Sequence, residues 1–172
     1  STANGASGTT ATLPASDFTG IAAGINDLGQ VVGRREVTTA VIWNPTATRG
    51  DYEQPVDLPV NGAGPTIAYG INSSGQVVGY TGSGHQSFLW SPSAPNGATG
   101  TVVTLPRLPG AAIGEAHRIN DRGQVAGWSG GAYLWQPSAP NSSTGLLHNV
   151  MAVQDTNGFT NLINEAGWIT GQ

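Results

Sequence analysis

The sequence predicts an all-β, β-propeller-like fold of about four blades, each with four antiparallel strands. Three observations predict it. A nonapeptide occurs four times, and three of its copies are followed by the same two further strand patterns. The chain has 26 glycines and 11 prolines in 172 residues and no long stretch of helical periodicity. Four strands in a repeat of about 45 residues are typical of a propeller blade, which packs face to face with its neighbours.

The nonapeptide occupies residues 25–33 and returns at 71–79, 119–127 and 163–171. Its first residues are Ile25, Ile71, Ile119 and Ile163, spaced by 46, 48 and 44 residues. Two short β-prone runs flank a polar turn in each copy. The asparagine at the second position can accept a hydrogen bond from the backbone two residues on, and the glycine at the fifth suits a left-handed conformation. We therefore expect a hairpin with a type I turn closed by a glycine bulge.

Three copies carry a carboxylate in the turn, namely Asp27, Asp121 and Glu165. A calcium site is one interpretation of these residues. Their spacing, however, matches neither an EF-hand loop nor the nonapeptide calcium repeat. The two middle positions of the turn also vary freely among the copies, as an exposed tip allows. We therefore interpret the carboxylates as turn residues and expect no metal site.

The third strand pattern occupies residues 40–45, 87–92 and 132–137 and ends at a proline each time. Alternation places Trp43, Trp90 and Trp135 on one face, and Ile42, Leu89 and Leu134 on the other. A strand that is apolar on both faces is typical of stacked sheets. We therefore expect the three tryptophans in the core.

The fourth strand pattern follows a polar connection, at residues 55–59, 101–106 and 146–151. Residues 1–14 align without gaps with residues 93–106 and are identical at nine of the 14 positions. The chain therefore divides into a partial repeat (1–14), repeats at about 15–59, 60–106 and 107–151, and a second partial repeat (152–172). One blade is split between the N- and C-termini and lacks its third strand. Either residues beyond Gln172 supply that strand, another chain supplies it, or this sequence is a window cut from a longer array of repeats. We expect the place to be filled, because open strand edges favour aggregation.

Composition excludes several classes of partner and chemistry. All six basic residues are arginine and the net charge is −4, which disfavours nucleic acid as a partner. No apolar run reaches 18 residues, so we expect no membrane span. The chain has no cysteine, which excludes disulfides and thiolate chemistry. We expect no cofactor.

Catalytic patterns are weak. Residues 127–131 fit the G-x-S-x-G pattern around Ser129, but that pattern needs a strand–turn–helix setting that the repeat does not provide. His85, His117 and His148 lie in different phases of the repeat, so they form no repeated ligand set. The carboxylates form no recurring pair suited to acid–base catalysis. We predict that the protein is not an enzyme.

Four residues at strand ends or in loops are candidates for binding a ligand such as a sugar: Trp128, Tyr80, Tyr69 and His117. Aromatic faces stack on apolar ligand surfaces. The alternative is edge packing, since single exposed aromatic residues are common on protein surfaces. Asn72 and Asn141 begin tripeptides that fit the N-glycosylation pattern.

The nonapeptide Ile-Asn-Asp-x-Gly-Gln-Val-Val-Gly, followed by Ala-x-Leu-Trp, resembles the HAF family of probable extracellular repeats. The His-Ala-Phe triad of that family falls on residues 39–41, 86–88 and 131–133, where no histidine occurs. The resemblance implies a secreted or surface-attached bacterial or archaeal protein with a propeller-like β fold. It implies no activity and no catalytic residue.

Two functions follow as expectations. The first is an extracellular structural or adhesive protein that assembles into filaments or surface layers by completing a strand between subunits. The second is a carbohydrate-binding, lectin-like propeller that recognises surface glycans. Repeated binding sites predict similar loops, yet residues 15–20, 60–66, 107–114 and 152–159 differ in length and composition. The sequence therefore favours self-assembly.

Overall fold

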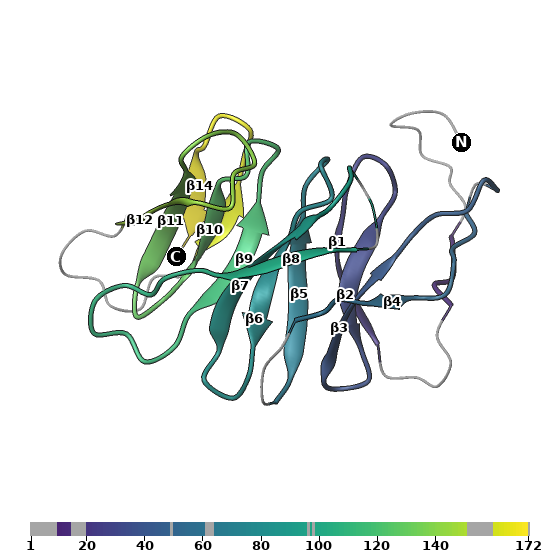
Figure 1. Cartoon of the computed structure of the whole chain (residues 1–172), viewed down its shortest axis with the longest axis horizontal. Helices are drawn as coiled ribbons and strands as arrows, with labels where there is room; N and C mark the ends of the chain where they lie inside the picture. Colours follow the sequence, from purple (N-terminus) through teal and green to yellow (C-terminus); the bar gives the residue numbers. More distant parts are fainter. Residues whose placement is uncertain are drawn as a thin grey trace.

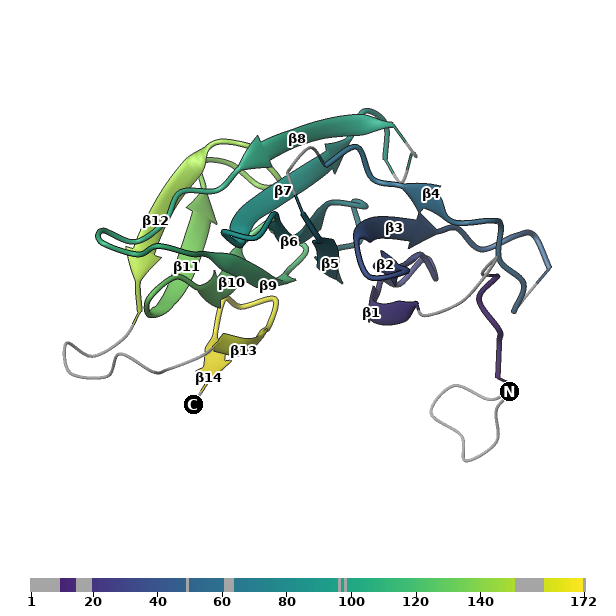
Figure 2. The same cartoon turned by 90° about the horizontal axis from the view of Figure 1, so that it is seen from below.

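A computed structural model describes residues 10–14, 20–48, 50–60, 64–95, 97, 99–150 and 160–171. The predicted fold class is confirmed, because these residues form an all-β, propeller-like structure without a helix. Fourteen strands make three four-stranded antiparallel sheets and one two-stranded sheet. The sheets follow one another face to face along an open arc (Figure 1, Figure 2).

Strands are paired in chain order within each sheet. The first sheet contains β1 (Ile21–Ile25), β2 (Val31–Arg35), β3 (Thr39–Trp43) and β4 (Val56–Asp57). The second contains β5 (Thr66–Ile71), β6 (Val77–Thr81), β7 (Gln86–Pro92) and β8 (Gly100–Thr104). The third contains β9 (Glu115–Ile119), β10 (Val125–Trp128), β11 (Ala132–Pro137) and β12 (Gly145–Asn149). The terminal hairpin consists of β13 (Thr160–Ile163) and β14 (Ile169–Gly171).

The predicted turn chemistry is confirmed in all four nonapeptides. In the first, the side chain of Asn26 accepts hydrogen bonds from the backbone of Leu28 at 3.2 Å and of Gln30 at 2.9 Å. The backbone N–H of Gly29 donates to the Asn26 carbonyl at 2.9 Å. The four turn glycines have positive φ angles of 80°, 80°, 79° and 83° (Gly29, Gly75, Gly123 and Gly167). A side chain at these positions would be strained.

A β-bulge lies in the first strand of each sheet, which the sequence analysis did not predict. In the three four-stranded sheets the extra, unpaired residue is Ala23, Tyr69 or His117. At each of these residues the register with the second strand shifts by one position. A bulge bends its strand and re-aims the side chain of the extra residue. Tyr69 and His117 are thereby positioned between neighbouring sheets, where they meet.

The core lies between the sheets. One cluster joins Val32 and Ile42 of the first sheet to Phe88 and Trp90 of the second. The next cluster joins Leu89 of the second sheet to Tyr133 and Trp135 of the third. Burial of the tryptophans is confirmed, with exposed fractions of 2%, 0% and 1% for Trp43, Trp90 and Trp135. Leu134 is only half-buried, because the terminal hairpin covers less of the third sheet than a full sheet would.

The two parts of the split blade lie at opposite ends of the arc (Figure 2). Residues 10–14 include no strand, so the expected first strand is not seen in the described part of the chain. They nevertheless lie over the first sheet, where Leu13 packs against Val31 and Trp43. The Trp43 indole N–H donates to the Pro14 carbonyl at 2.9 Å. Leu13 thus takes the place on the first sheet that Leu105 takes on the third.

Candidate functional site

The hairpin turns of successive repeats are joined by their asparagines. The Asn26 amide donates to the carbonyl of Asn72 at 3.0 Å, and Asn72 donates to that of Asn120 at 3.1 Å. Asn120 in turn donates to the carbonyl of Asn164 at 2.9 Å. We call these four residues the asparagine ladder. Each asparagine closes its own turn and also binds the next repeat.

The turn carboxylates form a second set of contacts between repeats. The Asp121 carboxylate accepts the backbone N–H and the hydroxyl of Ser73, both at 2.7 Å. The Glu165 carboxylate accepts the backbone N–H of Asp121 at 3.0 and 3.2 Å. The turn tips surround a hollow of about 180 Å³. The described residues include no cluster suited to a metal ion, and these carboxylates bind neighbouring tips.

The ladder has a direction, so the two ends of the arc differ. At the last repeat, the amide nitrogen of Asn164 has no partner among the described residues. At the first repeat, the carbonyl of Asn26 accepts a bond from its own turn but none from a preceding repeat in the described chain. The carboxylate of Asp27 likewise accepts no hydrogen bond from a described residue. One end therefore presents a donor and the other presents acceptors.

Apolar side chains that are buried between inner repeats are exposed at the ends. Ile25 of the first sheet is 65% exposed, whereas its counterparts Ile71 and Ile119 are 7% and 9% exposed. Trp168 of the terminal hairpin is 76% exposed, whereas Gln76 at the same repeat position is 3% exposed. A hollow of about 430 Å³ lies on the free face of the first sheet, lined by residues that include Leu13 and Ile25. Both ends therefore have the surface of an inner repeat without its neighbour.

A second constellation lies away from the turn tips, between the second and third sheets. The ring of His85 stacks on that of Tyr80, with centroids 4.1 Å apart and an interplanar angle of 19°. Tyr69 lies 5.8 Å from Tyr80 and 5.6 Å from His117, the latter edge to face. Tyr80 is only 9% exposed, so most of its aromatic face is already covered.

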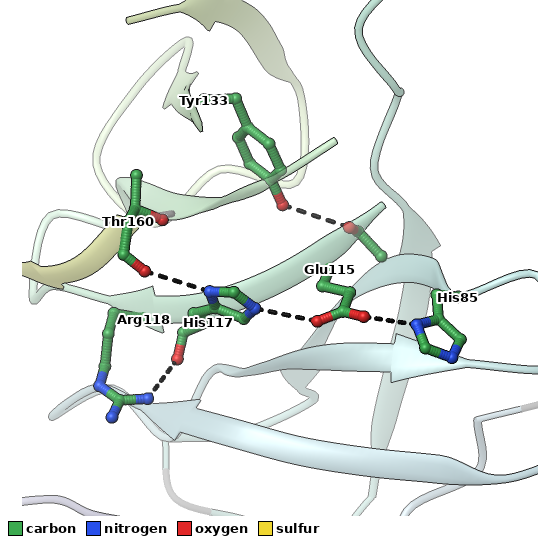
Figure 3. A network of polar contacts seen from close by, with 7 residues as sticks. His85, Glu115, His117, Arg118, Tyr133 and Thr160 are labelled. Carbon is green, nitrogen blue, oxygen red and sulfur yellow. Dashed lines mark hydrogen bonds and ion pairs between the residues drawn. The ribbon is translucent and has the colours of Figure 1, made fainter. Parts of the chain in front are cut away.

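Glu115 and His117 together link residues of the second repeat, the third repeat and the terminal hairpin (Figure 3). The Glu115 carboxylate contacts Nδ1 of His85 in the second repeat and lies 3.1 Å from Nε2 of His117. The other ring nitrogen of His117, Nδ1, lies 3.1 Å from the backbone carbonyl of Thr160 in the terminal hairpin. The hydrogen bonds from His117 and from His85 lower the pKa of Glu115 below its ordinary value. We call Glu115 and its two histidines the His–Glu–His relay.

Burial sets the ionisation of the neighbouring tyrosines. Desolvation raises the pKa of Tyr69 to about 12, with the nearby Tyr80 and Glu115 acting in the same direction. Desolvation also raises the pKa of the fully buried Tyr133, whose hydroxyl is 3.2 Å from Ser87 Oγ. Both tyrosines are therefore neutral at physiological pH.

The structure brings three of the four candidate ligand residues together, namely Tyr69, Tyr80 and His117. The fourth, Trp128, is half-buried and lies opposite Glu115 in the β9–β10 pairing. Sequence reasoning missed His85 and Glu115, which lie in different phases of the repeat and meet only in the folded chain. His148 lies apart on β12 and is exposed.

Three further residues that the sequence analysis considered are engaged in structural contacts. Asn72 is 3% exposed and its amide donates to three acceptors, which disfavours a glycan on the folded chain. The Asn141 amide donates to Ser74 Oγ at 3.1 Å. Ser129 is fully buried, and its hydroxyl donates to the Ile113 carbonyl at 3.0 Å. This hydroxyl is part of the loop scaffold.

Comparison of the chain with protein-family models, with curated proteins and with solved structures finds no match. In the described part of the chain, no helix has the length and hydropathy to cross a bilayer.

The relay predicts an acid-sensitive contribution to stability. Because the folded-state pKa of Glu115 is lowered, its contribution is fully present above the ordinary Glu range, near pH 4.3, and is lost as pH falls through the lowered value. Glu115→Gln removes the charge and should cost about 1–2 kcal/mol of unfolding free energy at pH 7. The difference from wild type should shrink at strongly acidic pH, as measured by denaturant titration.

Glu53→Gln is the matched control, because Glu53 is exposed and its side chain makes no hydrogen bond to a described residue. Its unfolding free energy should equal that of wild type at both pH values. An equal effect of the two substitutions at pH 7 would refute the role of the relay.

Proposed function

We propose that the protein is a non-enzymatic, extracellular structural protein whose copies assemble head to tail. The terminal hairpin of one copy packs on the free face of the first sheet of the next. The observation that carries this proposal is the exposure, at the two ends, of surfaces that inner repeats bury. Ile25 at 65% exposed, against Ile71 at 7%, is the clearest case. The extracellular location rests on the resemblance to the HAF family.

The contacts between inner repeats provide the geometry of the new interface. In register with the ladder, the Asn164 amide donates to the Asn26 carbonyl of the next copy. The backbone N–H of Glu165 donates to the Asp27 carboxylate, as Asp121 does to Glu165 within the chain. Burial of Ile25 and the neighbouring apolar face contributes about 25 cal/mol per Å² removed from water. The same pairs that join inner repeats thus join two chains.

The symmetry of this contact determines the form of the assembly. A head-to-tail contact uses two different surfaces, so it generates a closed ring if the rotation closes and a filament if it does not. Residues 10–14 already lie on the first sheet, so the composite repeat combines them with β13 and β14 of the preceding copy. Both forms cover the exposed apolar ends.

A carbohydrate-binding propeller is the second candidate. The meeting of Tyr69, Tyr80 and His117 favours it, since sugars bind to aromatic clusters. Tyr69 packs against the other two rings, however, and Tyr80 is covered by His85 and only 9% exposed, which leaves little free aromatic surface. Self-assembly is therefore the better-supported function.

Sedimentation velocity over a range of protein concentrations tests the assembly. The unaltered chain should sediment as species larger than a monomer whose size increases with concentration. Ile25→Asp places a charge in the proposed interface and should give a monomer. Val37→Asp is the matched control, because Val37 is a comparably exposed apolar residue (62%) in the turn between β2 and β3, at the other end of β2 from the nonapeptide turn. A monomeric wild type, or equal loss of assembly in the two variants, would overturn the proposal.

A further inference from the structure

The ring of His117 lies between two hydrogen-bond acceptors. Its Nδ1 is 3.1 Å from the carbonyl oxygen of Thr160, and its Nε2 is 3.1 Å from the Glu115 carboxylate. A carbonyl oxygen and an ionised carboxylate can only accept. A neutral imidazole has one N–H and satisfies one of them, whereas an imidazolium has two and satisfies both. The geometry around His117 is therefore that of the charged ring.

The contact with Thr160 holds the part of the chain that carries one assembly face. Thr160 is the first residue of β13 and is itself buried. At the other end of the hairpin, Asn164 and Glu165 are bound to the third sheet through Asn120 and Asp121. The two ends of β13 are thus fixed by different chemistry. The turn end is held by amide and carboxylate contacts, and the starting end is held by a titratable ring.

We propose that protonation of His117 clamps the terminal hairpin onto the third sheet and thereby makes head-to-tail assembly stronger in mildly acidic solution than at neutral or alkaline pH. This inference rests on the proposed function, since it concerns the hairpin that presents the assembly face. Deprotonation leaves either the Thr160 carbonyl or the Glu115 carboxylate facing a nitrogen lone pair. The ionised carboxylate is the stronger acceptor, so the remaining proton stays on Nε2. The Thr160 carbonyl then loses its donor, and the hairpin loses one of its attachments to the third sheet.

The groups around His117 support a charge at this position. Glu115, on the same strand, supplies the negative charge and is shared with His85 from the second sheet. The positive charge of Arg118 disfavours a second positive charge on the His117 ring. The Arg118 guanidinium, however, donates a hydrogen bond to the backbone carbonyl of His117 at 2.8 Å. Further titratable or charged groups on the described neighbouring strands are Tyr69 on β5, Tyr80 on β6, Tyr133 on β11 and, on β2, Arg34, which acts on Tyr69, and Arg35, which is paired with Asp57.

The pH range of the clamp follows from its two partners. It should weaken when rising pH removes the second ring proton of His117, because the neutral ring donates to only one of the two acceptors. Because the pKa of Glu115 is lowered, the carboxylate stays ionised throughout the mildly acidic range. Only protonation of Glu115, at a pH below the ordinary glutamate range, should release the clamp on the acid side.

Amide hydrogen exchange of β13 and β14 tests the clamp separately from assembly. The measurement uses the full chain carrying Ile25→Asp, so that no interface contributes. After correction for the intrinsic exchange rate, protection of the hairpin should be about fivefold greater at pH 5.5 than at pH 8, corresponding to loss of one hydrogen bond. His117→Gln should abolish this pH dependence. His148→Gln is the matched control on exposed β12 and should retain it.

The outcomes separate the two proposals. Suppose that hairpin protection in the Ile25→Asp chain depends on pH through His117, but the unaltered chain does not assemble. The clamp is then supported and the proposed function is overturned. Assembly with pH-independent hairpin protection overturns the clamp and leaves self-assembly standing. If His117→Gln fails to fold, ¹⁵N spectra of the histidine rings in the Ile25→Asp chain decide the question. A singly protonated His117 ring at pH 5.5, with hairpin protection unchanged from pH 8, would overturn the clamp.

Discussion

Replacing Gly79 with alanine is expected to abolish stable folding. A Cβ atom at this position of β6 would lie 1.8 Å from the carbonyl oxygen of Ile67 and 3.0 Å from the Cα of Ala68. Both atoms belong to the backbone of the paired strand β5, so no side-chain rotation can relieve the overlap. Relief requires displacing the bulge around Tyr69 and with it the packing between two sheets. We expect a loss of about 4 kcal/mol or more, a large part of the stability of an ordinary domain.

Denaturant unfolding followed by circular dichroism measures this loss. Gly84→Ala is the matched control, because a Cβ at Gly84 would meet only the Arg107 guanidinium, at 3.7 Å. Its unfolding midpoint should remain within about 0.5 kcal/mol of wild type, as for an exposed surface position. A Gly79→Ala protein as stable as the Gly84→Ala protein would mean that β5 does not contain the bulge.

The same glycine explains which parts of the fold were predictable from sequence. Gly33, Gly79 and Gly127 end copies of the nonapeptide, whose repetition and turn are both evident from the sequence. The turn was predictable because it depends on local chemistry, an asparagine side chain and a glycine with positive φ. The bulge was not predicted, because it depends on how closely β2, β6 or β10 approaches the strand before it.

Burial of the tryptophans was predictable for a related reason. Trp43, Trp90 and Trp135 lie on a strand that is apolar on both faces, and alternation alone places such a strand between sheets. The carboxylate contacts between turn tips were not predictable in this way. Asp121 and Glu165 differ in side-chain length, and each meets a different partner. Repetition in the sequence revealed the units of the fold, and only the packed structure revealed how the units recognise one another.

The His–Glu–His relay lay beyond sequence reasoning altogether. His85 comes from the loop between β6 and β7, whereas Glu115 and His117 lie on β9. Within the repeat these positions are out of phase, so a search for recurring ligand sets passes over them. The bulge brings His117 between the sheets, where it meets Tyr69. A non-recurring cluster in a repeat protein is therefore recognisable only once the sheets are stacked.

Asn72→Ala is expected to produce the second large loss of stability, about 3 kcal/mol or more. The Asn72 side chain accepts the backbone N–H groups of Ser74 at 3.1 Å and Gln76 at 2.9 Å. Its amide donates to the Gln76 side chain, the Asn120 carbonyl and the Asn141 side chain, each at 3.1 Å. Asn72 is 3% exposed, so alanine would leave several of these partners buried and unpaired.

Asn164→Ala provides the matched comparison, because Asn164 holds the equivalent turn in an exposed hairpin with no further repeat in the described chain. Among the described residues its side chain accepts only the backbone N–H groups of Ala166 and Trp168, each at 3.0 Å, and water can replace these bonds. We expect a loss of about 1 kcal/mol, measured by denaturant unfolding in the Ile25→Asp background. The difference between the two alanine variants then estimates what the buried amide contributes.

Asn72→Asp separates the turn from the ladder. Aspartate keeps the acceptor for the backbone of Ser74 and Gln76, but it loses the donor to the Asn120 carbonyl and places a negative charge beside that oxygen. If the asparagine ladder holds successive repeats together, Asn72→Asp should be destabilised nearly as much as Asn72→Ala. Wild-type stability in Asn72→Asp would mean that the asparagine serves only its own turn. The exposed amide of Asn164 could then not be expected to join two chains.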